Sequence, residues 1–330
     1  MSRTAVVIPN WNGLDTIQEC LDSVLKQTRE IIVVDNGSTD GSLEFIRSSY
    51  PAVELVKNKV NLGFAGGVNT GINKARELGY DYVILLNNDA VVENNWLKLL
   101  VSELDKQSDV GIATSKILTS DGKRIDSTGD VYTSWGLPYP RGRNEPTSNK
   151  YDQSRDIFSA SGGASIYRVA MLDEIGLFDN NFFAYYEDVD ISFRAQLYGW
   201  KVRYVPGAIV HHQIGSSSRR IKGFTTYQTM KNLPLVLIKN VPGKYILSVG
   251  IRLLFAQSLF LAKAVTKGNG WPAIKGAAKA VILTPASLKQ RSLNMANQKV
   301  SDDYIWGLVV HDLPPNAKAL RLIRKVFSIR

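Results

Sequence analysis

Short apolar runs alternate with helix-like patterns through the first hundred residues, and this alternation limits the chain to a small set of folds. Each apolar run is bounded by turn residues, which is typical of buried strands, and the segments between the runs carry apolar residues at helical spacing. We therefore predict an α/β fold with βα units on a mostly parallel sheet flanked by helices. The predicted strands are 5–8, 31–34, 53–56 and 82–86, and the predicted helices are 15–27, 41–48, 66–77 and 96–105.

Polar residues follow two of these strands directly. The second strand ends in Asp35-Asn36-Gly37, and the fourth ends in Asn87-Asn88-Asp89. Because the carboxyl ends of parallel strands lie at the same edge of a sheet, and open α/β sheets bind ligands at that edge, these side chains are candidates for one binding site.

Positive charge is concentrated in the last third of the chain. The net charge is +10, but residues 1–225 hold 24 Lys and Arg against 27 Asp and Glu, whereas residues 226–330 hold 16 against three. Such an excess indicates an anionic partner, either a nucleic acid, a phosphorylated ligand or an acidic lipid surface.

The single cysteine, Cys20, excludes an internal disulfide and fits a reducing compartment. No export signal precedes the first strand, so we expect a cytoplasmic location.

The rest of the chain is less regular. Residues 111–160 contain Gly, Pro, Ser and Asn clusters, which predict a long loop or a distorted hairpin. A small-residue strand is expected at 159–167 and a helix at 169–175. Beyond residue 225 we expect helices that break at Pro234, Pro242, Gly268-Asn269-Gly270 and Pro285. Arg252, Gln257 and Lys263 interrupt the apolar window 245–265, which therefore falls short of a membrane span and is expected to lie on a membrane or in a core.

Two segments of the first half could bind a nucleotide. Asp35 lies in a strand-to-helix turn, where Asp and Gly are common for local reasons alone, but its carboxylate could also accept hydrogen bonds from a nucleobase. The segment 61–71 is rich in glycine, which allows close approach of a ligand to the backbone. It matches neither the G-x-G-x-x-G fingerprint nor a Walker motif, so phosphate or sugar contact is one interpretation and simple packing is the other.

Asp89 is the candidate metal ligand of the first half. A divalent cation that bridges two phosphates needs hard oxygen ligands, and one or two protein carboxylates are enough for Mg²⁺ or Mn²⁺. The alternative is that Asn87-Asn88-Asp89 forms only a turn. Its position in line with Asp35 favours the metal site.

A second acidic group lies at 183–194, where Glu187 and Asp188 stand among aromatic residues near a predicted helix start. Acids at that place could act as helix caps. A carboxylate next to another acid in an apolar setting is also suited to act as a general base, since its pKa is raised. A later strand ends on His211 and His212, which are candidate metal ligands.

Taken together, these segments resemble the family-2 glycosyltransferases, in particular the branch that contains bacterial rhamnosyltransferases and other cell-surface polysaccharide enzymes. The resemblance spans about residues 4–235. The segments that carry it are Val7-Ile8-Pro9-Asn10-Trp11-Asn12-Gly13, the Asp35 turn, 61–71, Asn87-Asn88-Asp89, Gly176-Leu177-Phe178-Asp179, Tyr186-Glu187-Asp188-Val189-Asp190, and His212 followed by Gly215 and Ser217.

The resemblance implies a GT-A fold, an inverting mechanism and a nucleotide-diphospho-sugar donor, either a dTDP- or a UDP-sugar, with Mn²⁺ or Mg²⁺ as cofactor. Asp188 would be the catalytic base, with Glu187 beside it, and Asp89 and His212 would lie at the metal. The implied nucleotide-sugar-binding residues are Pro9, Asn10, Asp35, Asn36, Gly63, Phe64, Asn69, Asn88 and Asp89. Two features depart from the family: Asn87-Asn88-Asp89 replaces Asp-x-Asp, and Lys231-Asn232 replaces Arg-Asn.

Three regions follow from this interpretation. Residues 1–110 would form the nucleotide-sugar-binding half of the GT-A domain, 111–225 its acceptor-binding half, and 226–330 a basic helical extension. In the last segment, Leu320, Ile323 and Phe327 fall at helical spacing among basic residues, which predicts peripheral attachment to an anionic membrane at the inner face of the cell membrane. A solvated helix packed on the catalytic domain is the alternative, and no nucleic-acid-binding module is recognised.

The predicted function is the transfer of rhamnose or another hexose to a cell-surface polysaccharide or lipid-linked glycan acceptor. Two other functions remain open from the sequence. A nucleotidyltransferase would share the base-binding half and the metal but would need an activating Lys/Arg loop near its N-terminus, where Trp11-Asn12-Gly13 stands instead. A membrane-associated binding subunit without activity would not need the acids at Asp89, Glu187 and Asp188.

Overall fold

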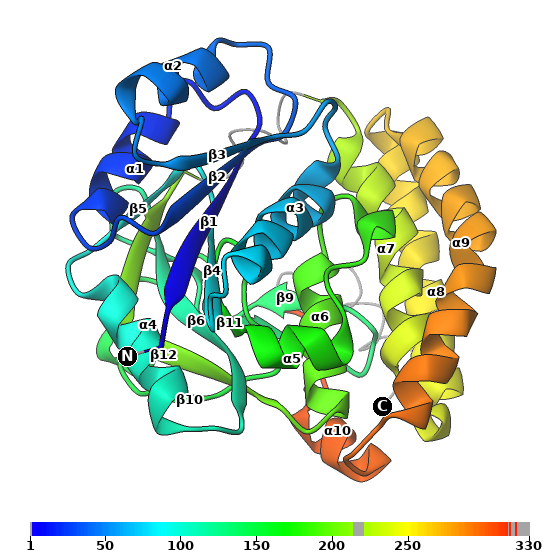
Figure 1. Cartoon of the computed structure of the whole chain (residues 1–330). Coiled ribbons are helices and arrows are strands. Elements are labelled where there is room, and N and C mark those ends of the chain that lie inside the picture. Colours follow the sequence, from blue (N-terminus) through cyan, green and yellow to red (C-terminus); the bar gives the residue numbers. More distant parts are fainter. Residues whose placement is uncertain (1, 214–220, 316, 318–320, 322–330) are drawn as a thin grey trace. The chain divides into compact units, whose positions relative to one another are not determined.

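The computed structural model describes residues 2–213, 221–315, 317 and 321. The chain divides into two compact units (Figure 1). Unit 1 contains residues 1–130 and 140–221, and unit 2 contains 131–139 and 222–330. Gly215, Ser217 and most of the predicted basic helix at the C-terminus lie outside the described residues.

Unit 1 is built on a mixed sheet whose main path runs in the order β10-β12-β6-β11-β4-β1-β2-β3, with β5 paired to β12 and β7 paired to β6. The strands are β1 (Thr4–Asn10), β2 (Ile31–Asp35), β3 (Glu54–Lys57), β4 (Tyr82–Leu86), β5 (Ala90–Val92), β6 (Val110–Thr119), β7 (Ile125–Ser127), β10 (Arg155–Asp156), β11 (Ala164–Arg168) and β12 (Lys201–His212). A separate short pair, β8 (Asp130–Val131) and β9 (Tyr139–Pro140), lies where the chain passes between the units.

The four predicted strands are confirmed as β1 to β4, and all of them run parallel to their neighbours in this half of the sheet. Strands β2 and β4 are buried along their whole length, because helices cover both faces of the sheet centre. Near-continuous apolar runs are what such doubly covered strands require. The antiparallel strand β11 then joins β4 to β6 and extends the sheet into the second half of the unit.

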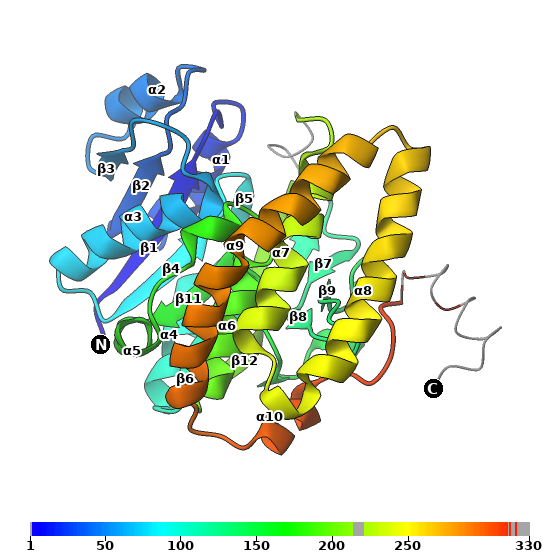
Figure 2. The same ribbon diagram turned by 90° about the vertical axis from the view of Figure 1, so that its right-hand side faces the viewer.

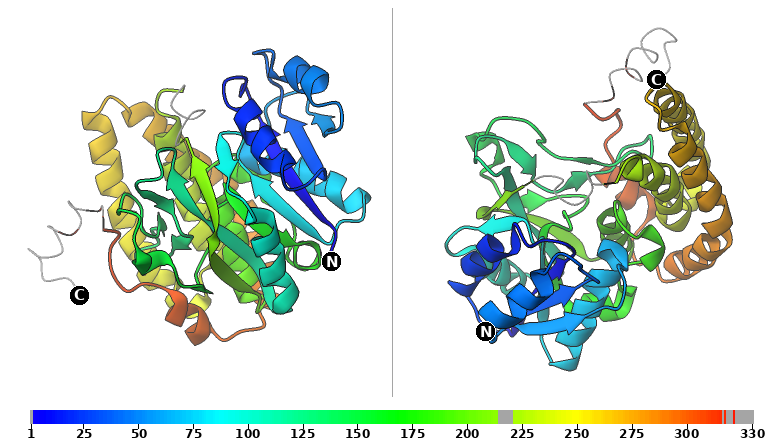
Figure 3. Two further views of the ribbon diagram at one scale, coloured as in Figure 1. Left: turned by 90° about the vertical axis from the view of Figure 1, so that its left-hand side faces the viewer. Right: turned by 90° about the horizontal axis from the view of Figure 1, so that it is seen from above.

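The helices of unit 1 agree with the predicted ones to within a few residues (Figures 2 and 3). They are α1 (Ile17–Leu25), α2 (Ser42–Ser49), α3 (Gly63–Glu77), α4 (Trp96–Lys106), α5 (Val169–Ile175) and α6 (Glu187–Leu197), with two short 3₁₀ turns at Asn149–Tyr151 and Asn180–Phe182. Helices α1 and α4 share one apolar cluster with Val6 and Ile8 of β1. Because side chains alternate along a strand, Val7 faces the other side of the sheet, where α3 packs.

For 111–160 the sequence predicted a long loop or a distorted hairpin, and of the two the loop was wrong at its beginning, where β6 and β7 form an irregular antiparallel pair. Residues 110–119 form β6, a central strand that is buried along almost all of its length and pairs with β12 in parallel. Gly111 and the polar residues Thr114, Ser115 and Lys116 hid its strand pattern. The strand expected at 159–167 begins later, at Ala164, and the segment before it forms turns.

The described part of unit 2 is mainly helical: α7 (Phe224–Asn240), α8 (Gly243–Thr266), α9 (Gly270–Ala296) and α10 (Asp302–Leu308). The predicted breaks at Pro242 and at Gly268-Asn269-Gly270 are confirmed, but those at Pro234 and Pro285 were wrong, since both prolines lie inside helices. Proline at 234 leaves the carbonyl of Met230 without its helical donor. The side chain of Gln257 on α8 donates to that carbonyl at 3.3 Å, which compensates the loss.

Helix α8 is longer than the apolar window seen in the sequence. Its 24 residues are long and apolar enough to cross a membrane by length and composition alone.

Side chains of α9 cap the C-terminal end of α7. Arg291 donates hydrogen bonds to the carbonyls of Ile238 and Val241, and Asn294 donates one to the carbonyl of Lys239. Cationic and amide donors at a helix C-terminus satisfy its unpaired carbonyls.

The packing of α3 on the sheet yields a test of the glycine-rich segment. A Cβ atom on Gly71 would lie 2.3 Å from Val7 Cγ1 and 3.0 Å from Val34 Cγ2. We expect Gly71→Ala to lower the free energy of unfolding by about 1–3 kcal/mol through overpacking, although alanine is the better helix former. Urea denaturation would measure this. The control is Asn73→Ala on the exposed face of α3, which gains helix propensity without touching the sheet. A stability of Gly71→Ala equal to that of the control would contradict the close packing.

Candidate active site

The carboxylate of Asp35 lies at the carboxyl end of β2 and is fully buried. Its Oδ2 accepts a long hydrogen bond from the backbone N–H of Ser38, at 3.4 Å. Its Oδ1 is buried and has no hydrogen-bond partner among the described residues. A buried acceptor that receives no hydrogen bond costs free energy. A carboxylate oxygen of this kind is therefore a good candidate for ligand binding.

Asn10 and Asn88 connect the ends of β1 and β4. Asn88 donates from Nδ2 to Asn10 Oδ1 at 2.7 Å, and Asn10 donates in turn to Ser42 Oγ at 2.9 Å. The turn after β1 closes over this pair, because a Cβ on Gly13 would lie 2.0 Å from Asn88 Nδ2. The two amides therefore fix the edge of the sheet next to Asp35.

Asn36 and Asn69 hold loops in place. Asn36 donates to Asn61 Oδ1 and to the carbonyl of Gly63, and its Oδ1 accepts from Asn58 and from the backbone of Leu62, which uses the whole capacity of the amide. Asn69 makes three hydrogen bonds to the segment 178–180. Both side chains shape the site through the backbone that they position.

The glycines of segment 61–71 are explained by close packing. Gly63 has a φ of +73°, and a Cβ there would lie 2.2 Å from the carbonyl oxygen of Phe183. Gly67 lies opposite Asn36 and Pro9, and a Cβ added to it would lie 3.1 Å from Asn36 Nδ2 and 3.6 Å from Pro9 Cβ. The ring of Phe64 faces Gly162, whose Cβ would be 3.2 Å from it and 3.4 Å from Asp188 Cβ. Phe64, at the start of α3, thus lies near the predicted base.

Asp89 and His212 meet because β5, which follows Asp89, pairs with the end of β12. Asp89 Oδ1 lies 3.1 Å from His212 Nε2. His211 points elsewhere, with its Nε2 2.8 Å from Glu93 Oε1. Of the two histidines predicted as candidates, the structure therefore brings only His212 to the acidic group.

Asp126 is a site residue that the sequence did not reveal. Its Oδ2 lies 2.8 Å from His212 Nδ1, and its other oxygen forms an ion pair with Arg143. Burial alone would raise the pKa of Asp126, but the hydrogen bond from His212 and the charge of Arg143 hold it below its usual value. Both residues lie in the irregular region 111–160, where the sequence pattern carries no motif to single them out.

The carboxylates of Asp89 and Asp126 also change the pKa of His212. Burial disfavours its charged form, yet hydrogen bonds to Asp126 and Asp89 outweigh this and raise the pKa of His212 to about 9. The carboxylate on Nδ1 fixes the ring so that Nε2 faces Asp89, which is how carboxylates orient histidines that bind metals.

Asp188 opens α6 and lies in a rigid backbone setting. Its Oδ2 accepts from the N–H of Gly162 at 2.9 Å, and its Oδ1 accepts from the N–H of Val189 at 2.9 Å. Burial raises the pKa of Asp188 even though these donors favour its charged form. Glu187 beside it is buried, with 6% of its surface exposed.

Three residues before α6 adopt left-handed backbone conformations that only glycine adopts easily. Phe183, Tyr185 and Tyr186 have φ values of +62°, +71° and +70°. Such strain persists only where the surrounding structure enforces it, and it is concentrated at functional sites. It sets the direction in which Glu187 and Asp188 leave the backbone.

A second carboxyl group, Asp130, lies near Asp188. The backbone N–H of Asp130 donates to the carbonyl of Ser159 at 2.6 Å, and the hydroxyl of Ser159 donates to the carbonyl of Asp188 at 3.3 Å. Burial, and next the charge of Asp188, raise the pKa of Asp130 well above its usual value. Repulsion between the two carboxyl groups therefore favours protonation of Asp130 at a higher pH than for an exposed aspartate.

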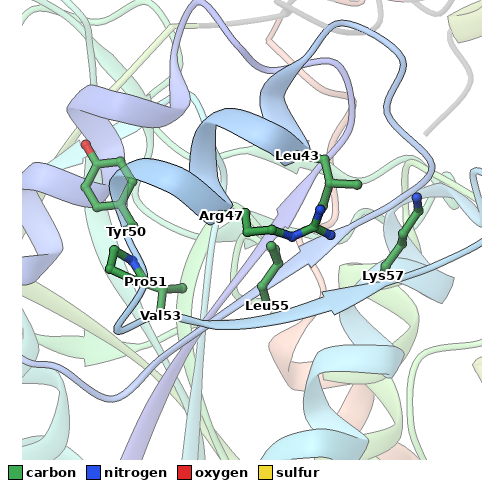
Figure 4. Close-up of a pocket in the computed structure, with 7 residues that line it drawn as sticks. All are labelled: Leu43, Arg47, Tyr50, Pro51, Val53, Leu55 and Lys57. Atoms are coloured by element: carbon green, nitrogen blue, oxygen red, sulfur yellow. The ribbon is translucent and has the colours of Figure 1, made fainter.

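A cavity of about 240 Å³ is formed by α2 and β3, and its lining contains none of the predicted site residues (Figure 4). It is lined by Leu43, Arg47, Tyr50, Pro51, Val53, Leu55 and Lys57. Lys231 and Asn232, which depart from the family pattern, lie buried on α7 in unit 2.

The sequence of residues 5–176 matches the family model of glycosyl transferase family 2. The chain belongs to this family. It is a glycosyltransferase with a GT-A fold, as the resemblance in the sequence implied. Among curated proteins it is 28% identical over 212 residues to N-acetylglucosaminyl-diphospho-decaprenol L-rhamnosyltransferase of Mycobacterium tuberculosis, covering 57% of this chain and 68% of that protein. It is 26% identical to poly-beta-1,6-N-acetyl-D-glucosamine synthase of Staphylococcus epidermidis, of which it spans 47%.

Solved glycosyltransferase structures share the fold. GalNAc-T7 with UDP, GalNAc and Mn²⁺ superposes with a TM-score of 0.58 at 21% identity, over 74% of this chain and 49% of that one. TarS of S. aureus in complex with UDP-GlcNAc gives a TM-score of 0.57 at 17% identity, over 89% of both chains. The family match, together with this shared fold, supports the glycosyltransferase over the two alternatives that the sequence left open.

Asp126 offers a test of the Asp89–His212 pair. We expect Asp126→Asn to weaken binding of Mn²⁺ by the protein about 10- to 100-fold, because the amide no longer fixes the ring of His212. Electron paramagnetic resonance of free Mn²⁺ would measure the affinity directly. Glu93→Gln is the matched control, since Glu93 is the carboxylate partner of His211. Equal affinities of both variants and the wild type would exclude a role for Asp126 in holding the ion.

The Asp130–Asp188 pair gives a pH-dependent prediction. A carboxyl group whose pKa is higher in the folded than in the unfolded state opposes folding increasingly as the pH rises above its unfolded value, about 3.9. We therefore expect Asp130→Asn to raise the melting temperature at pH 7–8 and to change it little at pH 4. The opposite sign is expected for Asp121→Asn, because a hydrogen bond from Thr119 lowers the pKa of Asp121. A loss of stability in Asp130→Asn at neutral pH would contradict the raised pKa of Asp130.

Proposed function

We propose that this glycosyltransferase is an inverting, metal-assisted enzyme that transfers a hexose from a nucleotide-diphospho-sugar to a lipid-linked or polysaccharide acceptor. The observation that carries the proposal is the carboxylate of Asp188, held by two backbone N–H groups in the unit that also contains the Asp89–His212 pair. A fixed base and a cation site are the two groups that a single displacement at an anomeric carbon requires.

The donor would be a UDP- or dTDP-sugar. A uracil or thymine ring has one imide N–H, and the buried Oδ1 of Asp35 is one acceptor without a partner among the described residues. Pro9 and Asn10 at the end of β1 would line the base, Asn88 the ribose and Phe64 the sugar. The side chains of Asn36 and Asn69 and the backbone of Gly63 would support this site by holding its loops.

Mn²⁺ or Mg²⁺ would bind at Asp89 and His212. Among the described residues, no three or more His, Cys, Asp or Glu side chains are close enough together to hold a metal ion by themselves. Two protein ligands fit an ion that completes its shell with diphosphate oxygens and water. Such an ion, held by Asp89 and His212, would supply positive charge to stabilise the departing diphosphate. Two structural neighbours, GalNAc-T7 and the mannosyltransferase PcManGT of Pyrobaculum calidifontis, were crystallised with Mn²⁺.

Asp188 would take the proton of the acceptor hydroxyl as that oxygen attacks the anomeric carbon. The bond between this carbon and the diphosphate oxygen breaks in the same step, so the configuration is inverted. Because burial raises the pKa of Asp188, activity should fall at low pH as the carboxylate becomes protonated. Because the charge of Asp188 raises the pKa of Asp130, protonation of Asp130 would favour a charged Asp188.

Rhamnose is the first candidate sugar, since the mycobacterial relative is named as an L-rhamnosyltransferase that acts on a diphospho-decaprenol-linked acceptor. Residues 1–110 would form the nucleotide-sugar half of the catalytic unit, 111–225 the acceptor half, and 226–330 a membrane-associating region. A lipid-linked acceptor would give peripheral attachment at the inner face of the membrane a purpose, with an anionic bilayer as the partner.

Donor binding tests the proposed nucleotide and metal site, and turnover tests the proposed base. Isothermal titration against UDP-, dTDP- and GDP-sugars, with and without Mn²⁺, should show metal-dependent binding of one nucleotide class, and Asp89→Ala should abolish the metal dependence. Asp188→Asn should bind the donor normally but lower kcat by about 10²- to 10⁴-fold. Asp121→Asn, in an exposed turn, serves as the control. No binding of any nucleotide would refute the proposed donor site, and unchanged kcat in Asp188→Asn would refute the assigned base.

A further inference from the structure

Exposed apolar side chains are concentrated on two helices of unit 2. More than half of the large hydrophobic residues that are exposed in the described part of the chain lie on α8 and α9. Such a concentration indicates an interaction surface, because soluble proteins rarely expose many large apolar side chains close together. The two helices are joined by the turn at Gly268 and diverge from it (Figure 2).

On α8 the exposed residues form one stripe. Leu247, Ile251, Leu254 and Val265 are separated by 4, 3 and 11 residues, which places them on one side of a helix, and the first three are 74%, 61% and 69% exposed. The opposite side of the helix is anchored within unit 2. Val249, Leu253 and Ala256 are buried there, and Arg252 donates to the carbonyl of Ser134.

Helix α9 continues the pattern. Trp271, Val281 and Ile282 are 65%, 72% and 68% exposed, and Ile274, Leu288 and Leu293 are about half exposed. Lys275, Lys279 and Lys289 are exposed on the same helix, and the chain contains no acidic residue between 226 and 301. Lysine stems can lie along an apolar surface while their ammonium groups reach anionic headgroups.

We propose that the exposed faces of α8 and α9, called here the α8–α9 face, insert into the interfacial layer of an anionic lipid bilayer. The combination of large apolar residues with lysines and no acids matches acyl chains and lipid phosphates. A second copy of the same face would bring the lysines against each other. A full span by α8 would break the hydrogen bonds that Gln257 and Arg252 make within unit 2.

This inference rests on the proposed function only for its purpose, which is access to a lipid-linked acceptor. It differs from attachment by the basic C-terminal residues in its driving force. Insertion of the α8–α9 face depends mainly on apolar area, so the face should bind neutral vesicles weakly and anionic vesicles more strongly, and binding should persist in part at high salt.

Flotation of the full-length protein with vesicles of phosphatidylcholine, with and without phosphatidylglycerol, tests the proposal. We expect Ile251→Ser and Val281→Ser each to lower partitioning roughly tenfold on both vesicle types. The triple change of Lys275, Lys279 and Lys289 to Gln should remove only the preference for anionic lipid. Val60→Ser in unit 1 is the matched control, since Val60 is 61% exposed. Quenching of tryptophan by brominated lipid, lost in Trp271→Phe, would report insertion.

Each other outcome contradicts the proposal. Vesicle binding that is unchanged in the apolar variants would assign attachment to another segment. A wild-type dimer in light scattering that becomes monomeric in Ile251→Ser would assign the face to a second copy. Donor titration of the same variants keeps the two proposals separate, because a variant that loses vesicles but binds donor normally leaves the catalytic proposal intact.

Discussion

The complete burial of β2 and β4 is the constraint on which the catalytic unit depends. Helices cover both faces of these strands, so no polar side chain can lie along them without losing its water. Polar groups are therefore displaced to the strand ends, where Asp35 and the Asn88–Asp89 pair stand together. The close contact of Gly71 with Val7 and Val34 belongs to the same constraint, because it lets α3 cover the sheet completely.

The segment 126–130 links the two chemical parts of the site. Asp126, at its start, orients His212 toward Asp89, and Asp130, at its end, lies beside Asp188. Arg143 compensates the charge of Asp126, whereas burial and the charge of Asp188 raise the pKa of Asp130. This short segment thus affects the electrostatics at both the proposed cation site and the proposed base.

The sequence predicted the parts of this fold that follow from local periodicity. Strands β1 to β4, their helices and the edge residues all follow from patterns a few residues long. The sequence could not predict β6, because its polar residues Thr114, Ser115 and Lys116 are buried by tertiary contacts. Nor could it predict the role of Asp126, because its partner His212 lies 86 positions away in the sequence. Pro234 was predicted to break its helix for the same reason, since its compensation by Gln257 comes from another helix.

The two units differ in how their charged groups are compensated. In unit 1 the carboxylates lie at the sheet edge, and backbone N–H groups, Arg143 and His212 compensate them, as the proposed cation and donor sites require. In unit 2 the acids are missing from α7 to α9, and Lys275, Lys279 and Lys289 of α9 lie at the surface beside exposed apolar residues. A buried charge needs a compensating group nearby, whereas a cationic apolar surface needs an external anion. The distribution of acids along the chain therefore separates a catalytic unit from one suited to a lipid surface.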